Sequence, residues 1–350
     1  MSVESGRRSS PLLMTLPLLA VIAVAGLTWA KWWPYTLKLQ SVLSDRSWAG
    51  TSILSSGGTA DTAPSLAGGW DFTLAYGRAV WKALVVALLL AAAVETLVPR
   101  RRLMAALSGR GAYGGALAGG LLSLPCMMCT CCTAPLARTL RRNGAPTSSV
   151  LAYWLGNPTL NPAVLAFLAI VAPWQWFAVR LLAGAVLVFG VTVVIGRLAG
   201  RDAASPVPAA PEEEGAATVP RRFAGALGRL SLTLVPEYAV VVFAIGTFRG
   251  WIFPLDDGAA HWAIPALIAA ATLGTLVVIP TAGEIPILLG LAAAGAGTGI
   301  LGVLLITLPA ISLPSMAMVV RSLSLRVTLA TAGGVAATGL VAGGLLWAIG

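Results

Sequence analysis

The sequence predicts an all-α, polytopic membrane protein made of two repeat halves. Of its 350 residues, 57% are hydrophobic and only 10% are charged, whereas a soluble protein carries about 25% charged residues. Apolar runs long enough to cross a bilayer recur along the chain. Two further apolar segments are interrupted by Pro and Gly, which predicts a broken or re-entrant helix in each half.

The net charge of +10 fits a membrane protein better than a nucleic-acid-binding protein. The Arg residues gather at the ends of the predicted spans, as the positive-inside distribution of Lys and Arg requires. They form no cluster typical of a groove-reading surface. We therefore expect a lipid bilayer around the chain, and no nucleic acid as a partner.

Residues 1–72 are predicted to form an N-terminal anchor span and an outer loop. Arg7 and Arg8 precede an apolar run, and we place the span at 12–30. No convincing small-residue cleavage site follows this run, so we interpret it as an uncleaved signal anchor. The polar stretch 31–72 is then the predicted loop.

Residues 73–197 are predicted to form the first transmembrane repeat. Its interrupted segment, 111–137, contains a Gly-rich stretch followed by Pro125 and Pro135. Such residues free backbone groups that lipid cannot satisfy, so protein or a water-filled cavity must surround them. The predicted full spans of this half are 73–98, 148–171 and 174–197.

Residues 198–225 are rich in Pro, Ala and Glu and are predicted to form a flexible cytoplasmic linker. Residues 226–350 then form the second transmembrane repeat. Its interrupted segment, 262–290, contains Pro280 and Pro286. The predicted full spans of this half are 226–248, 299–320 and 327–349.

One constant shift along the chain relates the two halves, namely the shift that carries Pro135 onto Pro286. We call it the repeat shift. It superimposes three pairs of helix-breaking residues: Pro135 and Pro286, Gly144 and Gly295, Pro158 and Pro309. Transporters often carry such repeats, with the substrate site at the interrupted segments. The positions of the Arg residues predict that the two halves are inverted copies. The alternative is that both interrupted segments cross the bilayer completely.

A cluster of four cysteines is the strongest functional signal, because Cys126, Cys129, Cys131 and Cys132 lie within seven residues and the chain has no others. Thiols are soft ligands, so a cluster at membrane depth predicts a binding site for a soft metal or metalloid as cargo. Three alternatives remain: cysteines that act as small hydrophobic residues in helix packing, a structural zinc site, and the C-x-x-C spacing of redox proteins.

Asn157 and Asn161 are predicted to share one face of a span, four residues apart, and each directly precedes a proline, Pro158 or Pro162. Polar side chains at this depth face a cavity or a partner helix. We therefore treat both as candidate substrate-binding residues, with hydrogen bonding between helices as the alternative.

Glu284 and Glu237 are carboxylates inside apolar segments, and such residues often carry coupling protons. By the repeat shift, Glu284 superimposes on a position beside the cysteines. The alternative for both is an ion pair with a basic residue such as Lys82 or Arg229. Arg180, in contrast, is expected to extend toward the membrane surface without a functional role.

The stretch PCMMCTCCTAPLARTLRRNGAPTSSVLAYWLGNPTLNPAVL, residues 125–165, resembles the signature of a bacterial predicted-permease family that includes the organoarsenical efflux permeases. The matching features are a short proline-flanked cysteine motif, a Pro-Leu pair, a double-Arg turn and a Pro-containing span. They are Cys129-Thr130-Cys131, Pro135-Leu136, Arg141-Arg142-Asn143-Gly144 and Asn157-Pro158.

The resemblance covers most of residues 73–349 and implies export of a thiol-reactive substrate, such as a trivalent methylated arsenical, across the inner membrane. The chain departs from the pattern at Cys126 and Cys132, which are additional cysteines. It also has Gly283-Glu284 where the first copy has thiols.

We therefore predict a multi-pass permease of the bacterial inner membrane, not an enzyme, that needs no cofactor. It would export a soft, thiol-reactive metal or metalloid species by secondary transport with proton coupling. The alternatives are a membrane thiol oxidoreductase that uses Cys126 and Cys129, and a non-transport metal-handling assembly factor. No Gly-Lys-Ser/Thr phosphate loop occurs in these residues, so they contain no ATPase of that type.

Overall fold

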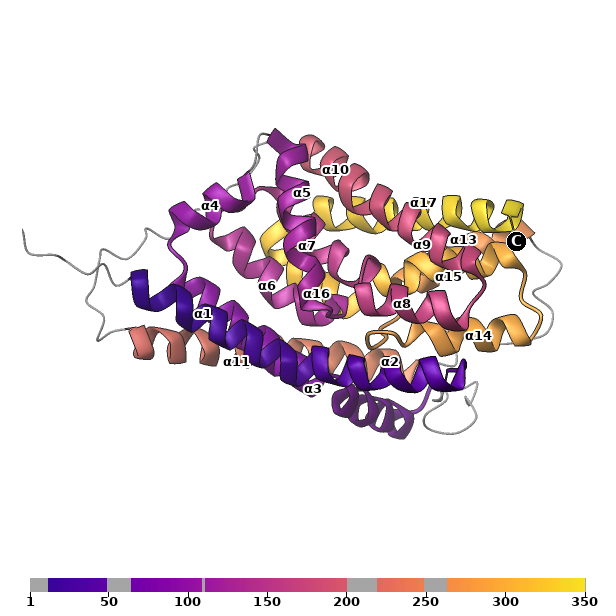
Figure 1. Ribbon diagram of the computed structural model, residues 1–350, viewed down its shortest axis with the longest axis horizontal. Coiled ribbons are helices and arrows are strands. Elements are labelled where there is room, and N and C mark those ends of the chain that lie inside the picture. The colour runs from indigo at the N-terminus through magenta and orange to yellow at the C-terminus, as the bar shows by residue number, and fades with distance from the viewer. Residues whose placement is uncertain (1–11, 49–63, 109–110, 200–218, 249–262, 350) are drawn as a thin grey trace, which may run out of the picture.

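The computed structural model describes residues 12–48, 64–108, 111–199, 219–248 and 263–349. These residues form helices and connecting turns, with no strand among them (Figure 1). The predicted all-α class is confirmed.

Five helical stretches in the described ranges are long and apolar enough to cross a bilayer, and a bent pair raises the number to six. The bent pair consists of α15 (Thr298–Ala310) and α16 (Leu313–Leu323), whose axes differ by 53°. The five continuous stretches are Leu66–Leu97, Thr147–Val171, Trp174–Leu198, Val219–Thr247 and Leu325–Ile349. The chain is therefore a polytopic membrane protein, as predicted.

A long N-terminal helix replaces much of the predicted outer loop. α1 (Leu12–Leu27) continues through the π-helical turn η1 (Thr28–Trp32) into α2 (Trp33–Asp45). The predicted loop 31–72 is therefore wrong for residues 31–45, and also for its last residues, where the next helix already begins. Residues 49–63 lie outside the described residues.

Aromatic and aliphatic contacts explain why α2 is helical despite its polar composition. Tyr35 and Trp48 each make an edge-to-face contact with Phe167 of α8, at ring-centroid distances of 6.0 Å and 5.5 Å. Val42 is completely buried. This periodic apolar stripe packs α2 against the first half, and burial rather than composition decides its structure.

The first half runs from α3 to α10. In order, its elements are α3 (Leu66–Leu97), α4 (Arg100–Ser108), α5 (Gly111–Ser123), the 3-10 turn η3 (Leu124–Cys126), α6 (Thr130–Arg142), α7 (Thr147–Thr159), α8 (Pro162–Val171), α9 (Trp174–Val186), the π-helical turn η4 (Leu187–Val191) and α10 (Thr192–Leu198). The predicted interruption between α5 and α6 is present.

The second half runs from α11 to α17, and its elements are α11 (Val219–Thr247), α13 (Ala263–Leu276), α14 (Glu284–Ala293), α15, α16 and α17 (Leu325–Ile349). The predicted interruption lies between α13 and α14. α11 begins inside the predicted linker 198–225, because Pro220 is compatible with the first turn of a helix. Residues 200–218 of that linker lie outside the described residues.

Helix boundaries recur at the spacing that the helix-breaking residues suggested. The repeat shift carries both ends of α7 onto the ends of α15, and the start of α8 onto the start of α16. It also carries the start of α9 and the end of α10 onto the two ends of α17. Gly144 and Gly295, which this shift pairs, both have positive φ angles, of 92° and 86°. Whether the halves are inverted across a bilayer stays a prediction.

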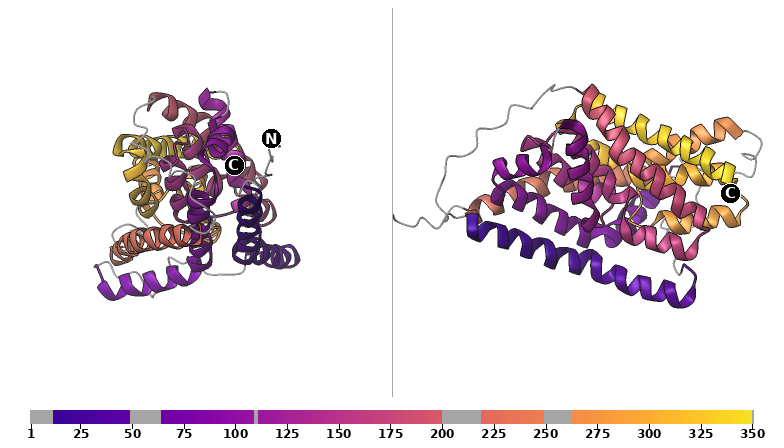
Figure 2. Two further views of the ribbon diagram at one scale, coloured as in Figure 1. Left: turned by 90° about the vertical axis from the view of Figure 1, so that its left-hand side faces the viewer. Right: turned by 45° about the horizontal axis from the view of Figure 1, so that its top comes forward.

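The helices form two groups that meet at the interrupted segments. α1, α3 and α11 run side by side along one long edge of the molecule, and α17 lies on the opposite edge with α9 and α10 (Figures 1 and 2). α6 of the first half packs on α16 of the second half between these edges. The interior of the molecule therefore contains backbone that is not continuous helix.

Glycines permit the closest helix contacts. A Cβ atom on Gly119 of α5 would lie 2.1 Å from the carbonyl oxygen of Ser149 in α7. A Cβ atom on Gly302 of α15 would lie 2.7 Å from the carbonyl oxygen of Ala342 in α17. Small residues let backbones approach closely in membrane proteins, where packing rather than water drives association.

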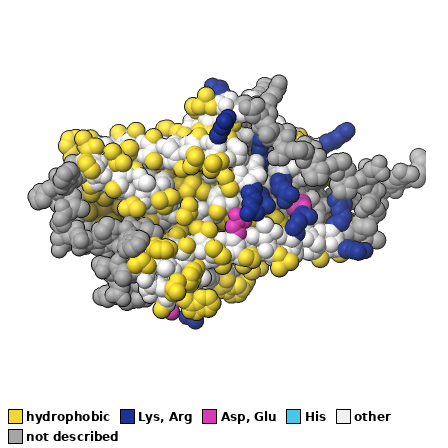
Figure 3. Space-filling model, turned by 180° about the vertical axis from the view of Figure 1, so that it is seen from behind, with side chains coloured by type: hydrophobic (Ala, Val, Ile, Leu, Met, Phe, Trp, Pro, Cys, Tyr) yellow, Lys and Arg dark blue, Asp and Glu magenta, His cyan; other side chains and the backbone are white. Residues whose placement is uncertain are grey.

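Charged side chains gather toward one end of the face seen in Figure 3, and most of the rest of that face is hydrophobic. Among the described residues, Arg229 pairs with Glu95, and Arg321 Nη2 lies 3.9 Å from Oε1 of Glu237. The distribution resembles that of a membrane protein whose basic residues lie on one side of the bilayer.

Candidate functional site

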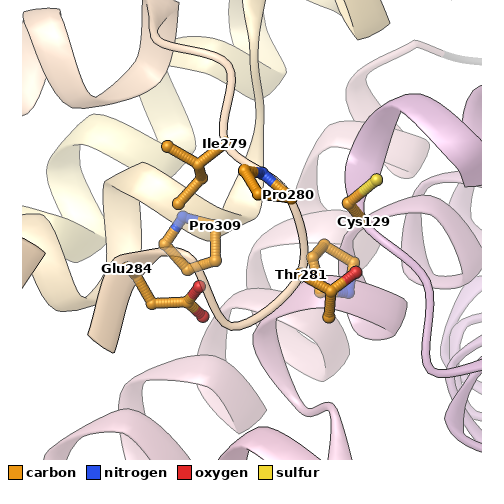
Figure 4. A pocket seen from close by; sticks show the side chains of 7 residues that line it. Cys129, Ile279, Pro280, Thr281, Glu284 and Pro309 are labelled. Carbon is orange, nitrogen blue, oxygen red and sulfur yellow. The ribbon is translucent and has the colours of Figure 1, made fainter. Parts of the chain in front are cut away.

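A small cavity lies where the two interrupted segments meet. Its volume is about 10 Å³, enough for roughly one water molecule. Both halves contribute to its wall (Figure 4), which consists of Cys129, Pro158, Ile279, Pro280, Thr281, Glu284 and Pro309. Two of the pairs related by the repeat shift are here, Cys129 with Pro280 and Pro158 with Pro309.

The first break, between η3 and α6, is stabilised by Asn157. Met127 has a left-handed backbone with φ of 49°, which is uncommon for a residue other than Gly and is typical of functional sites. The N–H of Met128 lacks a helical partner and donates to Oδ1 of Asn157 at 2.7 Å. Asn157 is completely buried. It therefore holds the break in shape, one residue before Cys129.

The second break, between α13 and α14, uses a different set of residues. Ala282 has φ of 67°, and the N–H of Gly283 donates to the carbonyl oxygen of Pro280 at 2.8 Å. A Cβ atom on Gly283 would lie 2.9 Å from that same oxygen. Only Gly fits this turn without a shift, and the turn places Glu284 at the start of α14.

The four cysteines are all buried and all free. The sulfur atoms of Cys129 and Cys132 are 3.2 Å apart, at the first turn of α6. Cys131 directs its sulfur to Ser312 Oγ of the second half, also at 3.2 Å. Cys126 contacts the hydroxyl of Tyr153 at 3.3 Å. Within the described ranges, no group of three or more His, Cys, Asp or Glu residues is arranged to hold a metal ion.

Asn161 caps a helix. Its Oδ1 accepts from the N–H of Ala163 at 3.0 Å and of Val164 at 3.4 Å, at the start of α8. The side-chain nitrogen atoms of Asn157 and Asn161 are buried and have no hydrogen-bond partner. Such donors are costly in a dry interior, so each retains the capacity to bind an acceptor. Neither Asn is part of the cavity wall described above.

Arg180 has a position that contradicts the expectation from the sequence. It does not extend toward the membrane surface, since its side chain is completely buried. Its Nη2 lies 2.7 Å from Oε1 of Glu284. From the sequence, an ion pair was the alternative to proton coupling for Glu284, with Lys82 or Arg229 as examples of the partner. The structure does show an ion pair, but its partner is Arg180.

Proline explains why a guanidinium group is stable at this place. A proline lacks the N–H that would bond to the carbonyl four residues earlier. Pro162 thereby frees the carbonyl of Pro158, and Pro309 frees that of Leu305. Arg180 donates to both, at 2.9 Å and 3.3 Å, and also to the carbonyl of Thr159 at 3.2 Å. One side chain thus satisfies the broken helices of both halves and binds the carboxylate.

Glu237 lies elsewhere. It is a neighbour of Arg321, its side chain is 19% exposed, and one of its carboxylate oxygens has no hydrogen-bond partner. Of the residues selected from the sequence, the structure therefore brings Cys129 and Glu284 to one cavity, with Cys132 and Asn157 directly behind Cys129. Cys131 neighbours Cys129 and also contacts Ser312. Cys126, Asn161 and Glu237 are in other surroundings.

Two residues were missed by the sequence analysis. Arg180 is one, and Lys31 of η1 is the other: its side chain is 8% exposed, and its Nζ donates to Oγ1 of Thr281 in the cavity wall at 3.0 Å. The signal that could have found both is the same, namely a basic residue within or beside a long apolar run.

Comparisons with known proteins agree with these features. A family model described as predicted permease matches residues 66–347. The chain is 37% identical over 346 residues to the UPF0718 protein YraQ of Escherichia coli (strain K12), which covers 98% of each protein. No solved structure matches the chain.

Proposed function

Because the chain belongs to the predicted permease family, we propose that it is a secondary transporter for a soft, thiol-reactive metal or metalloid species. We place it in the bacterial inner membrane and infer export as its direction. The cargo binds at the junction of the two interrupted segments, as in other transporters built from repeats.

The observation that carries this proposal is the Cys129–Cys132 pair. Two sulfur atoms lie 3.2 Å apart at a break in the helix, and Cys129 is part of the wall of a cavity between the halves. Soft cations and trivalent metalloids prefer thiolate ligands. A pair of ligands also suits transport, because a cargo held by few bonds can be released.

We assign proton coupling to Glu284. In the structure it is paired with Arg180, which also holds carbonyl groups of both halves. Protonation of Glu284 would neutralise the carboxylate and weaken this connection, so the halves could move relative to each other. Glu237, which lies near Arg321, is proposed as the second proton-carrying residue.

Cys126, Cys131, Asn157 and Asn161 take supporting roles in this scheme. Asn157 shapes the first break, and the unpartnered amide nitrogens of both asparagines are available to a ligand when the site opens. Cys131 joins the halves through Ser312. Cys126 contacts Tyr153 and is proposed as a secondary thiol on the path of the cargo.

The test is flux into vesicles that contain the purified full chain. Ag(I) and phenylarsine oxide serve as probes in chloride-free nitrate buffer, with and without a pH gradient. Replacing both Cys129 and Cys132 by Ser should reduce the flux of the transported probe at least about tenfold. Cys126→Ser should reduce the flux less than the double variant, because Cys126 contacts Tyr153 and is only a secondary thiol in this scheme. Equal flux in the double variant and the wild type would rule out thiol binding of cargo.

The thiol oxidoreductase remains a weaker alternative. It relied on Cys126 and Cys129, yet Cys126 contacts Tyr153 while Cys129 contacts Cys132. An enzyme of this kind would have to cycle between thiol and disulfide during turnover. Thiol counting in acid-quenched samples taken during turnover distinguishes the two functions, because a transporter leaves the number of free thiols unchanged throughout.

A further inference from the structure

The N-terminal helix, which is outside both repeat halves, reaches the candidate site through η1. Lys31 donates to Thr281 Oγ1 of the second break at 3.0 Å and to the hydroxyl of Tyr35 at 3.3 Å. Its neighbour Trp32 donates from Nε1 to the carbonyl of Pro125, just before the first break, at 2.8 Å. π-helical turns are frequent at functional sites. This one fixes a lysine beside the two interrupted segments.

The charges inside the molecule do not balance. Among the described residues, three charged side chains are at least nine-tenths buried: Lys31, Arg180 and Glu284. Arg180 and Glu284 neutralise each other. None of the ion pairs formed by the described residues includes Lys31. With its thiols and hydroxyls in their neutral forms, the buried region therefore carries one excess positive charge.

An unpaired buried cation is costly, so a site of this kind favours a ligand that brings one negative charge. Thiols near Lys31 can supply it, since Cys129 is part of the same cavity wall as Thr281, to which Lys31 donates. Two thiolates carry two negative charges. Binding one monovalent cation between them leaves one, which matches Lys31.

We propose that Lys31 is a specificity-determining residue of the transport site and that the cargo is a soft monovalent cation, of the Cu(I) or Ag(I) class, held by Cys129 and Cys132. This inference rests on the proposed function, because it assumes that these two thiols bind the cargo. Lys31 acts as the counter-charge of the two-thiolate complex and does not itself bind the metal.

The chemistry of binding balances. The cation replaces the protons of two thiols, so two S–H bonds break, two metal–sulfur bonds form, and two protons leave to the solvent. The complex has a net charge of −1, and with Lys31 and the Arg180–Glu284 pair the buried region is neutral. A trivalent arsenical with two hydroxyl groups would instead lose two water molecules and form a neutral dithiolate, which leaves Lys31 uncompensated.

The number of ligands agrees with this assignment. The described residues offer a sulfur pair but no cluster of three or more metal-binding side chains. Soft monovalent cations are well held by few thiolates, whereas trivalent metalloids without an organic group require a third ligand.

The test compares Ag(I) with phenylarsine oxide in the same purified sample of the full chain in detergent. Lys31→Gln should lower the affinity for Ag(I) roughly 10- to 100-fold and change that for phenylarsine oxide less than threefold. Lys31→Arg, which keeps the charge, should retain Ag(I) binding. Lys82→Gln is the matched control, because Lys82 is exposed and lies over the rings of Trp29 and Trp81. The ratio of the two affinities does not depend on the fraction of folded protein.

The outcomes separate this inference from the proposed function. Loss of both probes after replacing Cys129 and Cys132, with an unchanged Ag(I)-to-arsenical ratio in Lys31→Gln, would overturn the role of Lys31 and leave thiol binding intact. A serine pair that still binds both probes would overturn both. Lys31→His gives the comparison within one sample. Relative to wild type, its Ag(I) binding should weaken as rising pH removes the imidazole charge. If the variant and the wild type show the same pH dependence, the proposal is contradicted.

Discussion

Arg180 shows how much one buried side chain can connect. Its guanidinium group contacts carbonyls of α7 and α15 and the carboxylate at the start of α14. Lys could not replace it, because an ammonium group lacks the planar arrangement of donors that reaches several acceptors at once. We therefore regard Arg180 as the residue that keeps the halves together while Glu284 is ionised.

Removing either partner of this pair should be costly. Arg180→Gln and Glu284→Gln each leave a buried charge unpaired or a set of carbonyls unsatisfied, and each should reduce the free energy of unfolding by about 3–5 kcal/mol. The double variant should be more stable than Arg180→Gln alone, since no lone carboxylate remains. Thermal unfolding in detergent measures this. Strictly additive losses would show that the two side chains do not interact.

At the scale of elements, close helix contacts decide which substitutions the fold tolerates. α5 and α7 touch at Gly119, and α15 and α17 touch at Gly302. At both places the nearest atoms belong to the opposite backbone, which cannot move away as a flexible side chain can. α5, which belongs to the first interrupted segment, therefore has no room for a methyl group where it contacts α7. α15, which follows the second interrupted segment, has none where it contacts α17.

Gly119→Ala should destabilise the protein, because its methyl group would lie 2.1 Å from the carbonyl oxygen of Ser149. Overpacking of this kind costs roughly 1–3 kcal/mol. Gly344→Ala is the control: it is exposed, its Cβ would meet nothing within 4 Å, and Ala favours a helix. Comparison of the two melting temperatures in detergent decides the point. Similar values for both variants would mean that α5 and α7 are not in such close contact.

At the scale of the whole molecule, the recurrence of helix boundaries is compatible with two inverted halves. The cavity at their junction has residues from both, including pairs that the repeat shift relates. If the halves cross the bilayer in opposite directions, movement of one against the other would expose this cavity to each side in turn.

Labelling tests the inversion. Arg142→Cys places an exposed cysteine at the last residue of α6, and Ala294→Cys places one in the turn after α14. A membrane-impermeant maleimide should label the first from the cytoplasmic side and the second from the outer side. The wild-type chain is the control and should show little labelling, because its four cysteines are buried. Labelling of both positions from the same side would exclude inverted halves.

The sequence by itself determined the class of the protein, the existence of the two interrupted segments and the spacing between the halves. These features follow from local causes: apolar length sets a span, and Pro and Gly interrupt a helix wherever they stand. The same local reasoning found the cysteine cluster, yet it could not say which two sulfur atoms lie together.

Only the tertiary structure decided the partners. Lys31, Arg180 and Glu284 are far apart along the chain, so no periodicity relates them. The pairing of Arg180 with Glu284, and the contact of Lys31 with Thr281, depend on how helices from both halves and the N-terminal segment pack. Hydrophobic contacts around Phe167 also made a helix of α2, in a stretch whose composition suggested a loop. Charge pairing and burial depend on distances in space, and these distances cannot be derived from the separation of residues along the sequence.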